Sequence, residues 1–257
     1  MTTTTTAPVH TSSSLRVVVA ADAESAAGMA AERISALIRS RPTAVLGVAT
    51  GSTPSPVYRA LQTLRRTEGL DLSQASAFAL DEYVGIDPRR PQSYRSVIDG
   101  EVTRSLGLDP LRVAIPDGSA PDLVEAAHAY EESIRSAGGV DLQILGIGHN
   151  GHIGFNEPGS AHDSLTRAVD LTPETRRANA RFFDGGIDDV PTQALTQGIG
   201  TILRAREIVL LAFGSGKAEA VARALEGSID RSSPASALRR HQAVTILLDK
   251  AAASMVG

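Results

Sequence analysis

The sequence predicts an α/β fold: a single doubly wound, mostly parallel sheet with helices on both faces, a Rossmann-like three-layer sandwich. Two observations predict it. From Leu15 onward, short apolar runs alternate with segments of helical spacing, and the apolar runs are continuous instead of alternating with polar residues. Continuous runs are typical of parallel strands that helices cover on both faces. Since no linker or internal repeat divides the chain, we expect one α/β domain over residues 15–257.

The elements follow from apolar composition and spacing. The expected strands are residues 15–20, 44–50, 76–83, 141–148, 208–213 and 243–249. The expected helices are residues 22–40, 55–66, 121–137, 191–204 and 216–227. In the first helix, apolar side chains recur every three or four residues, which indicates one buried face.

Composition excludes several function classes. The 257 residues are 42% hydrophobic and 21% charged, as in ordinary globular proteins. Cysteine is absent, which excludes disulfides, thiolate zinc sites, iron–sulfur clusters and a cysteine nucleophile. A net charge of -4 provides no basic surface for nucleic acid or an anionic membrane, and Trp is absent. An enzyme or a small-ligand binder is therefore expected.

Residues 1–14 are rich in Thr and Ser, and we expect them to be disordered. They lack the cationic start and the apolar stretch of a secretory signal. No run in the chain approaches the roughly 18–20 apolar residues of a membrane span. We therefore expect a cytoplasmic protein.

Small, turn-forming or reactive residues follow four of the expected strands. These segments are GSTP (51–54), DEYVG (81–85), GHNGH (148–152) and GSGK (214–217). In doubly wound sheets, ligands bind beyond the carboxyl ends of the strands. The four segments are therefore expected to line one edge of the sheet.

Two of these turns could hold an anion. Gly51, Ser52 and Thr53 precede a helix, where backbone N–H groups and hydroxyls can face a phosphate; the alternative is an ordinary helix cap. Lys217 in GSGK also precedes a helix, although the full P-loop pattern is missing. Lys217 and Lys250 are the only lysines beside 23 arginines. Two such turns at one edge favour a phosphate-bearing ligand.

The loop after residue 146 allows several interpretations. GIGHNG (146–151) matches the dinucleotide pattern G-x-G-x-x-G, but Pro158 and Gly159 fall where the required helix would continue. His149 and His152 do not have the spacing of a zinc site. We therefore expect neither a dinucleotide cofactor nor a metal.

Two side chains are candidates for proton transfer. His152 could be positioned by Asn150 and Glu157, since a carboxylate on one ring nitrogen fixes the tautomer; the alternative is a structural histidine. Asp81, at a strand end, could be a partly desolvated general base, or it could be a cap or a solvated acid beside Glu82.

Four segments together resemble the glucosamine-6-phosphate deaminases: LDEYVG (80–85), GIGHNGHIGFNEPGS (146–160), TRRANARFF (175–183) and GSGK (214–217). The resemblance extends from about residue 15 to 250. The related 6-phosphogluconolactonases look similar in fold and have a G-x-D-G-H turn. They lack the FNEP continuation and the DEYVG segment, which favours the deaminases.

The resemblance implies conversion of glucosamine 6-phosphate and water to fructose 6-phosphate and ammonia, without cofactor or metal. His152, oriented by Glu157 and Asn150, matches the ring-opening group of the family. Asp81 matches the base that removes the C2 proton.

Phosphate binding is implied for the Gly51–Thr53 turn, Arg181 and Lys217. Asn150 stands where some family members have aspartate, so an orienting role is expected for it.

The family also includes members that N-acetylglucosamine 6-phosphate activates between subunits. Arg167 matches one of their basic positions, but Val169 replaces a lysine, and the chain stops soon after its last strand. We therefore expect weak or absent activation, and assembly into a homo-oligomer stays open.

Two other functions fit parts of this pattern. A sugar-phosphate lactonase would use His152 to activate water. A sensor module would bind a sugar phosphate without turnover, but such modules usually carry a DNA-binding helix-turn-helix, and residues 1–14 are too short and polar for one.

Overall fold

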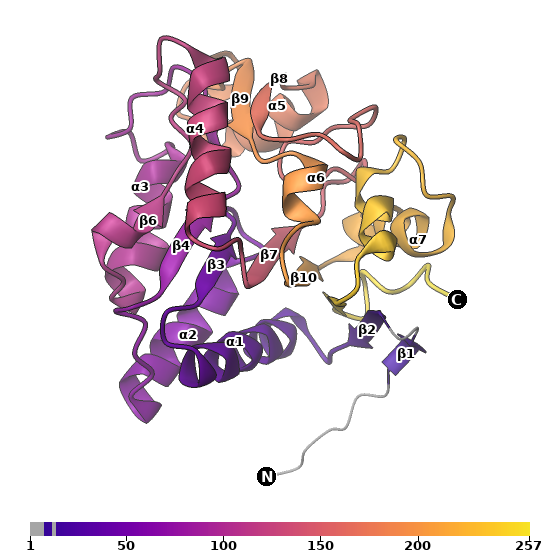
Figure 1. Cartoon of the computed structure of the whole chain (residues 1–257). Coiled ribbons are helices and arrows are strands. Elements are labelled where there is room, and N and C mark those ends of the chain that lie inside the picture. The colour runs from indigo at the N-terminus through magenta and orange to yellow at the C-terminus, as the bar shows by residue number, and fades with distance from the viewer. Residues whose placement is uncertain (1–7, 12–13) are drawn as a thin grey trace.

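A computed structural model describes residues 8–11 and 14–257 (Figure 1). Its main sheet consists of β1 (Pro8–Thr11), β2 (Leu15–Val19), β3 (Val45–Val48), β4 (Ser76–Ala79), β6 (Val113–Ala114), β7 (Leu142–Gly146), β10 (Glu207–Ala212) and β11 (Val244–Leu248). The strand order is β1-β2-β11-β10-β7-β3-β4-β6, and every pair except β1–β2 is parallel. The predicted sheet is thus confirmed.

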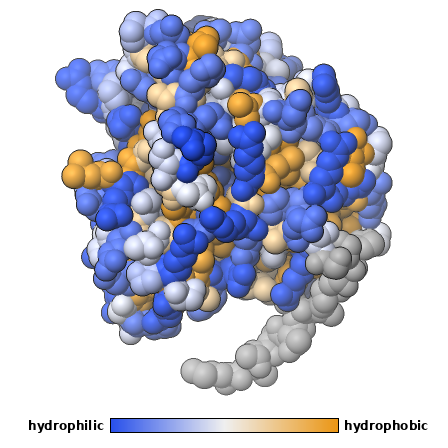
Figure 2. Space-filling model, viewed as in Figure 1, coloured by the Kyte–Doolittle hydropathy of each residue, from blue (hydrophilic) through white to orange (hydrophobic). Residues whose placement is uncertain are grey.

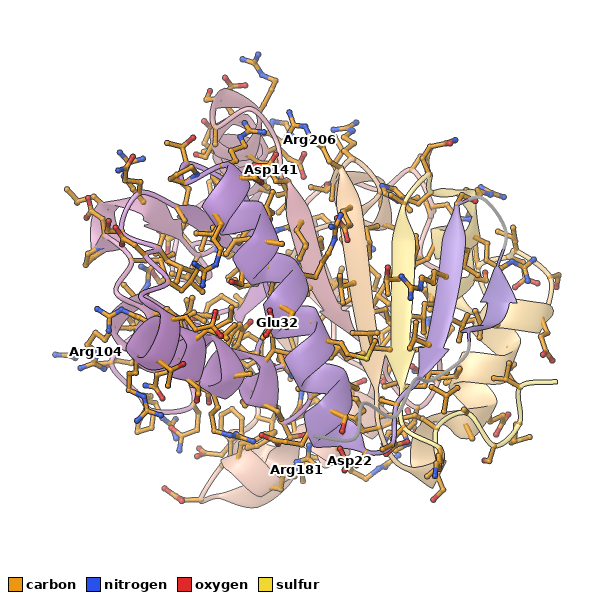
Figure 3. The ribbon with its side chains drawn as sticks, turned by 90° about the horizontal axis from the view of Figure 1, so that it is seen from below. Asp22, Glu32, Arg104, Asp141, Arg181 and Arg206 are labelled. Atoms are coloured by element: carbon orange, nitrogen blue, oxygen red, sulfur yellow. The ribbon has the colours of Figure 1, made fainter. Side chains whose placement is uncertain are left out.

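Helices cover both faces of this sheet. One face packs against α1 (Ala23–Ser40), α2 (Ser55–Glu68), α3 (Tyr94–Ile98) and a π-helical turn (Asp99–Arg104). The other packs against α4 (Leu123–Ser136), α6 (Ile199–Ile202), α7 (Ala218–Glu226) and a 3-10 segment (Pro234–Arg240). Figure 3, seen from below, shows α1 and α2 in front of the sheet. The three-layer prediction is confirmed.

The continuous apolar runs fill two cores at once. On β3, Leu46 and Val48 belong to the core under α1 and α2, whereas Val45 belongs to the core under α4. Successive side chains of a strand point to opposite faces, so a strand buried on both sides needs apolar residues throughout. The face in Figure 2, by contrast, is mostly hydrophilic, with apolar residues in small groups.

A second, antiparallel sheet lies beside the first and was not predicted. It contains β5 (Asp81–Tyr83), β9 (Gln193–Thr196) and β8 (Arg167–Asp170), in that order. The expected strand 76–83 is therefore split at Leu80, whose N–H donates to Val48 O of the first sheet and whose carbonyl accepts from Gln197 N.

The helix predicted over 191–204 is wrong in its first half, which forms β9. Strands β5 and β8 pair with both edges of β9, and this pairing outweighs local helical spacing. Only Ile199–Ile202 is helical there.

The N-terminal segment differs from expectation. The sequence predicts disorder over residues 1–14, whereas Pro8–Thr11 pairs with β2 as an edge strand. The free edge of β2 offers backbone donors and acceptors that such a segment can pair with. Residues 1–7 and 12–13 lie outside the described residues. In the described part of the chain, no helix has the length and apolar character that crossing a bilayer requires.

Candidate active site

The predicted motifs follow four adjacent parallel strands. In sheet order, GSGK follows β10, GHNGH follows β7, GSTP follows β3, and Asp81 lies just past β4. Figure 3 labels Asp141, at the start of β7, and Asp22, after the end of β2, at opposite ends of the sheet. Arg181 lies at the end marked by Asp22. All the predicted motifs therefore gather where the strands end, as the sequence indicates.

The loop after β7 is a tight turn that holds His152. The Gly151 N–H donates to Gly148 O at 3.0 Å, and the Gly148 N–H donates to His152 O at 2.9 Å. Gly151 has φ +88°, a conformation that favours glycine. A side chain at Gly148 would overlap the His152 ring, so the ring occupies space that glycine leaves free.

Glu157 connects the groups that the sequence assigned to proton transfer. Its Oε2 accepts from Asn150 Nδ2 at 2.6 Å and lies 3.5 Å from His152 Nδ1, an ion-pair distance without a regular hydrogen bond. Asn150 Oδ1 in turn accepts the His152 backbone N–H at 3.2 Å. The structure thus brings together His152, Asn150 and Glu157.

Two threonines hold the other oxygen of this carboxylate. Glu157 Oε1 accepts from Thr172 Oγ1 at 3.2 Å and from Thr175 Oγ1. Burial alone would raise the pKa of Glu157, but His152, Thr175 and Asn150 together lower it to about 2. Glu157 is therefore ionised at neutral pH and favours a proton on His152 Nδ1, which leaves Nε2 for proton exchange.

Asp81, unlike Glu157, is a buried carboxyl whose side chain forms no hydrogen bond within the described residues. It is 6% exposed. Gly154 lies against it, since a Cβ there would be 3.5 Å from Asp81 Oδ2 and 3.0 Å from Thr196 Oγ1. Burial, with a smaller contribution from the charge of Glu82, raises the pKa of Asp81 to about 8.

The neighbouring acid is satisfied by backbone donors. Glu82 Oε1 accepts the N–H groups of Tyr83 and Tyr94, and Oε2 accepts the N–H of Arg95 and the Ser93 hydroxyl, at 2.9–3.0 Å. Glu82 therefore caps the start of α3. Of the two adjacent acids, Asp81 is the one available to react.

Two cations converge near the His149–His152 loop. Burial and the nearby positive charge of Arg181 lower the pKa of Lys217. The pKa of His149 is also lowered, first by the charge of Lys217, then by burial and by the charges of His152 and Arg181. Within the described residues, neither Lys217 nor Arg181 forms a salt bridge. Two such cations without a carboxylate partner suit an anionic ligand.

The turn after β3 is also open to a ligand. Gly51 has φ +103°, and α2 begins after Pro54 without a side-chain cap, so Ser52 and Thr53 do not cap that helix. Thr53 lies beside Gly146, at the end of β7: a Cβ on that glycine would be 3.8 Å from Thr53 Cβ. The turn therefore lies next to the strand from which the His152 loop departs.

Sequence reasoning missed Thr172 and Thr175, and it considered His149 only as a metal ligand. The LTPET segment signals a helix start, and Thr172 does cap α5 (Pro173–Asn179), but no local pattern predicts the bonds to Glu157. Within the described residues, no group of three or more His, Asp or Glu side chains is placed to hold a metal ion.

Arg167, matched to an effector-binding position, is engaged within the chain. Its guanidinium donates to Asn156 Oδ1 at 2.9 Å and to Ser160 Oγ at 3.2 Å. It therefore braces the loop that follows Glu157.

Comparison with known proteins agrees with this geometry. Residues 19–247 match the model of the family described as glucosamine-6-phosphate isomerases/6-phosphogluconolactonase. Proteins named glucosamine-6-phosphate deaminase from Streptomyces coelicolor and from an Arthrobacter species are each 52% identical over 240 residues, covering 93% of this chain and 92% of theirs.

Solved structures give the same picture. A structure described as a monomeric glucosamine-6-phosphate deaminase superposes with a TM-score of 0.91 at 45% identity, covering 93% of this chain and 99% of that one. The 6-phosphogluconolactonase from Trypanosoma cruzi is only 20% identical, with a TM-score of 0.75 over 96% and 99% of the two chains, and shares the fold. The chain therefore belongs to the glucosamine-6-phosphate isomerase/6-phosphogluconolactonase family.

Proposed function

We propose that this chain converts glucosamine 6-phosphate and water to fructose 6-phosphate and ammonia. The observation that carries the proposal is the buried carboxyl of Asp81, which makes no side-chain hydrogen bond within the described residues and lies against Gly154, two residues from His152. An isomerisation that begins by removing a carbon-bound proton needs such a base. The proteins that are 52% identical to this chain carry the corresponding name.

The substrate phosphate binds to Lys217, Arg181 and the Gly51–Thr53 turn. The support for this assignment is the proximity of the two cations, their lack of ion-pair partners within the described residues, and the uncapped turn beside β7. Arg can form bidentate bonds to phosphate, and Lys supplies a point charge. Holding the phosphate at this edge fixes the sugar relative to Asp81 and His152.

Ring opening falls to His152. Its Nε2 accepts the proton of the anomeric hydroxyl and returns a proton to the ring oxygen as the C1–O5 bond breaks, which leaves an open-chain aldehyde. Glu157 stabilises the imidazolium at Nδ1, and Asn150 fixes the loop by bonding both Glu157 and the His152 backbone.

Asp81 then removes the C2 proton while a proton passes from the substrate ammonium to the aldehyde oxygen, which gives an enolamine. The same carboxyl returns its proton to C1, which yields a protonated imine at C2. Water adds to this imine, the C–N bond breaks, and ammonia leaves with fructose 6-phosphate. Each proton taken from carbon is returned to carbon, so the sequence consumes one water and needs no external oxidant or reductant.

Lactone hydrolysis, the alternative enzyme activity, involves no proton removal at C2 and gives the buried Asp81 carboxyl no catalytic role. The lactonase structures compared are about 20% identical and share the fold only. Location in the cytoplasm and a homo-oligomeric state stay predictions, and the 45%-identical deaminase is described as monomeric. We also expect hyperbolic kinetics that N-acetylglucosamine 6-phosphate leaves unchanged; sigmoidal kinetics that it makes hyperbolic would contradict this.

The test is to incubate the full chain with glucosamine 6-phosphate and to measure ammonium and fructose 6-phosphate in the same samples. Equimolar release of both supports the proposal. Hydrolysis of 6-phosphogluconolactone with no ammonium from the amino sugar would assign the chain to the lactonases and would make Asp81 a structural acid.

A further inference from the structure

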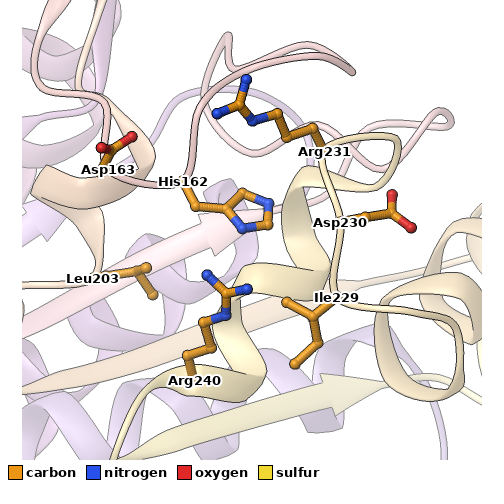
Figure 4. A pocket seen from close by; sticks show the side chains of 7 residues that line it. All are labelled: His162, Asp163, Leu203, Ile229, Asp230, Arg231 and Arg240. Carbon is orange, nitrogen blue, oxygen red and sulfur yellow. The ribbon is translucent and has the colours of Figure 1, made fainter.

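A cavity of about 540 Å³ lies outside the active site (Figure 4). It is bounded by residues after the Glu157 loop, by Leu203 after α6, by the segment after α7 and by Arg240. Its lining residues are His162, Asp163, Leu203, Ile229, Asp230, Arg231 and Arg240. None of them is a candidate for catalysis or substrate binding. The volume falls in the range of small-molecule sites.

Basic groups gather in this cavity without partners. Within the described residues, Arg231 and Arg240 form no ion pair. The Nε2 atom of His162 is buried and has no hydrogen-bond partner. Figure 4 shows the Arg240 guanidinium directed toward the His162 ring, with Arg231 on the opposite side of that ring. A bound anion could pair with one of the arginines and with the His162 ring.

Of the two carboxylates that line the cavity, Asp230 is already engaged, and Asp163 is exposed. Asp230 accepts the Ser228 hydroxyl at 2.5 Å, and the Ser232 N–H and hydroxyl at 2.8 and 2.5 Å. In Figure 4 its carboxylate points away from His162 and Arg240. Asp230 therefore shapes the loop and does not pair with the arginines.

The walls of the cavity are fixed before a ligand binds. The Gly159 N–H donates to Arg231 O at 2.8 Å, and the Asp230 N–H donates to Ser236 Oγ at 3.2 Å. Leu203 and Ile229 add apolar surface between the basic groups. A preformed site with unpaired cations and an apolar wall fits an organic molecule that carries an oxyanion.

We propose that this cavity binds a small organic phosphate, held by the charges of Arg231 and Arg240 and by His162 Nε2, with its carbon skeleton on Leu203 and Ile229. The proposal is independent of the proposed function, since it shares no residue with the active site. A failure of one leaves the other standing.

The test uses inorganic phosphate as the probe and the full chain carrying Lys217→Ala, which weakens phosphate binding at the active site. Backbone amide shifts in a ¹H–¹⁵N spectrum report the cavity through Ile229, Asp230 and Arg231, and the active site through Ser215 and Gly216. We expect saturable shifts at the cavity amides. Adding Arg231→Gln or Arg240→Gln should weaken that binding about tenfold, the effect of losing one charge-assisted hydrogen bond.

Arg223→Gln is the matched control, because this arginine lies on α7 outside the cavity and its carboxylate neighbour Glu219 is 4.0 Å away. It should leave the cavity shifts unchanged. Both cavity arginines are exposed, and the spectrum itself reports whether each variant is folded. Absence of saturable cavity shifts, or equal weakening by the control, would overturn the proposal. So would sedimentation that shows a dimer dissociated by Arg240→Gln, which would assign the cavity to self-association.

Discussion

Replacing Asp81 with Asn should abolish turnover and raise the stability of the protein at neutral and alkaline pH. The substitution keeps the shape of a side chain that is 6% exposed but removes the carboxylate that we propose takes the C2 proton. A positioned general base typically contributes about 10²–10⁴-fold to the rate, so kcat should fall by at least about a hundredfold. Phosphate-directed binding should persist, because Lys217 and Arg181 are unchanged.

The gain in stability follows from the raised pKa. In the unfolded chain Asp81 ionises near pH 3.8, and in the folded chain near pH 8. Between these values the unfolded state has released the proton and the folded state keeps it, so rising pH destabilises the native protein. At about 1.36 kcal/mol per pH unit, this cost reaches up to about 4 kcal/mol at pH 7. Asn does not titrate and avoids the cost.

The assay is urea unfolding of the wild type and of Asp81→Asn at pH 4.5, 6, 7 and 8.5, with ammonium release measured on the same preparations. The stability difference should grow from about 1 kcal/mol at pH 4.5 to its maximum at pH 8.5. Asp188→Asn, which changes an exposed carboxyl, should show no such trend. A stability difference that does not change with pH would refute the raised pKa of the Asp81 carboxyl. Near-normal turnover of Asp81→Asn would refute the role of Asp81 as the base.

The remaining predictions concern the phosphate and the proton-transfer group. Lys217→Ala should raise KM for glucosamine 6-phosphate at least about tenfold, with a smaller effect on kcat. Lys250→Ala, which changes the other, exposed lysine, should alter neither constant. An unchanged KM in Lys217→Ala would contradict the assignment of Lys217 to phosphate binding. Glu157→Gln should lower kcat, and it should also reduce the pH dependence of the free energy of unfolding in acid. Because the pKa of Glu157 is lowered to about 2, this carboxylate stabilises the wild type above pH 4.5. That stabilisation, up to about 3 kcal/mol, is lost as pH falls toward 2. The wild-type kcat/KM should rise with pH as the Asp81 carboxyl ionises, toward a plateau above about pH 8; a profile flat from pH 6 to 9 would contradict a base with that pKa.

The main sheet could be predicted because its physical signal is local. Each strand is buried on both faces, so a run such as residues 44–50 must be apolar throughout, and each crossover helix shows its own spacing. The second sheet could not be found in this way. Strand β9 is four residues long and pairs with segments more than twenty residues and more than one hundred residues away in sequence. Its identity as a strand depends on those partners, and no window of residues 191–204 contains them.

The candidate site, like the fold, has features that the sequence predicts and features that depend on tertiary contacts. Parallel strands end at one edge, so the sequence predicts that Asp81, His152 and Lys217 gather there. What each group can do depends on contacts from elsewhere in the chain. The bonds of Thr172 and Thr175 to Glu157 come from a helix start fifteen or more residues later, and they contribute to keeping that carboxylate ionised.

The adjacent acids Asp81 and Glu82 differ because tertiary contacts give them different surroundings. Neighbouring residues of a strand point to opposite faces, so β5 must separate the two carboxyls. On one face the start of α3 supplies three donors to Glu82, in addition to the N–H of Tyr83. On the other, Asp81 meets Gly154 and receives no donor within the described residues. A larger residue at Gly154 would approach the carboxyl, so the absence of a side chain there keeps the space beside Asp81 open. The acid that we propose to react is therefore the one without a hydrogen bond within the described residues, and this follows from the tertiary arrangement around β5 and not from the pair Asp-Glu itself.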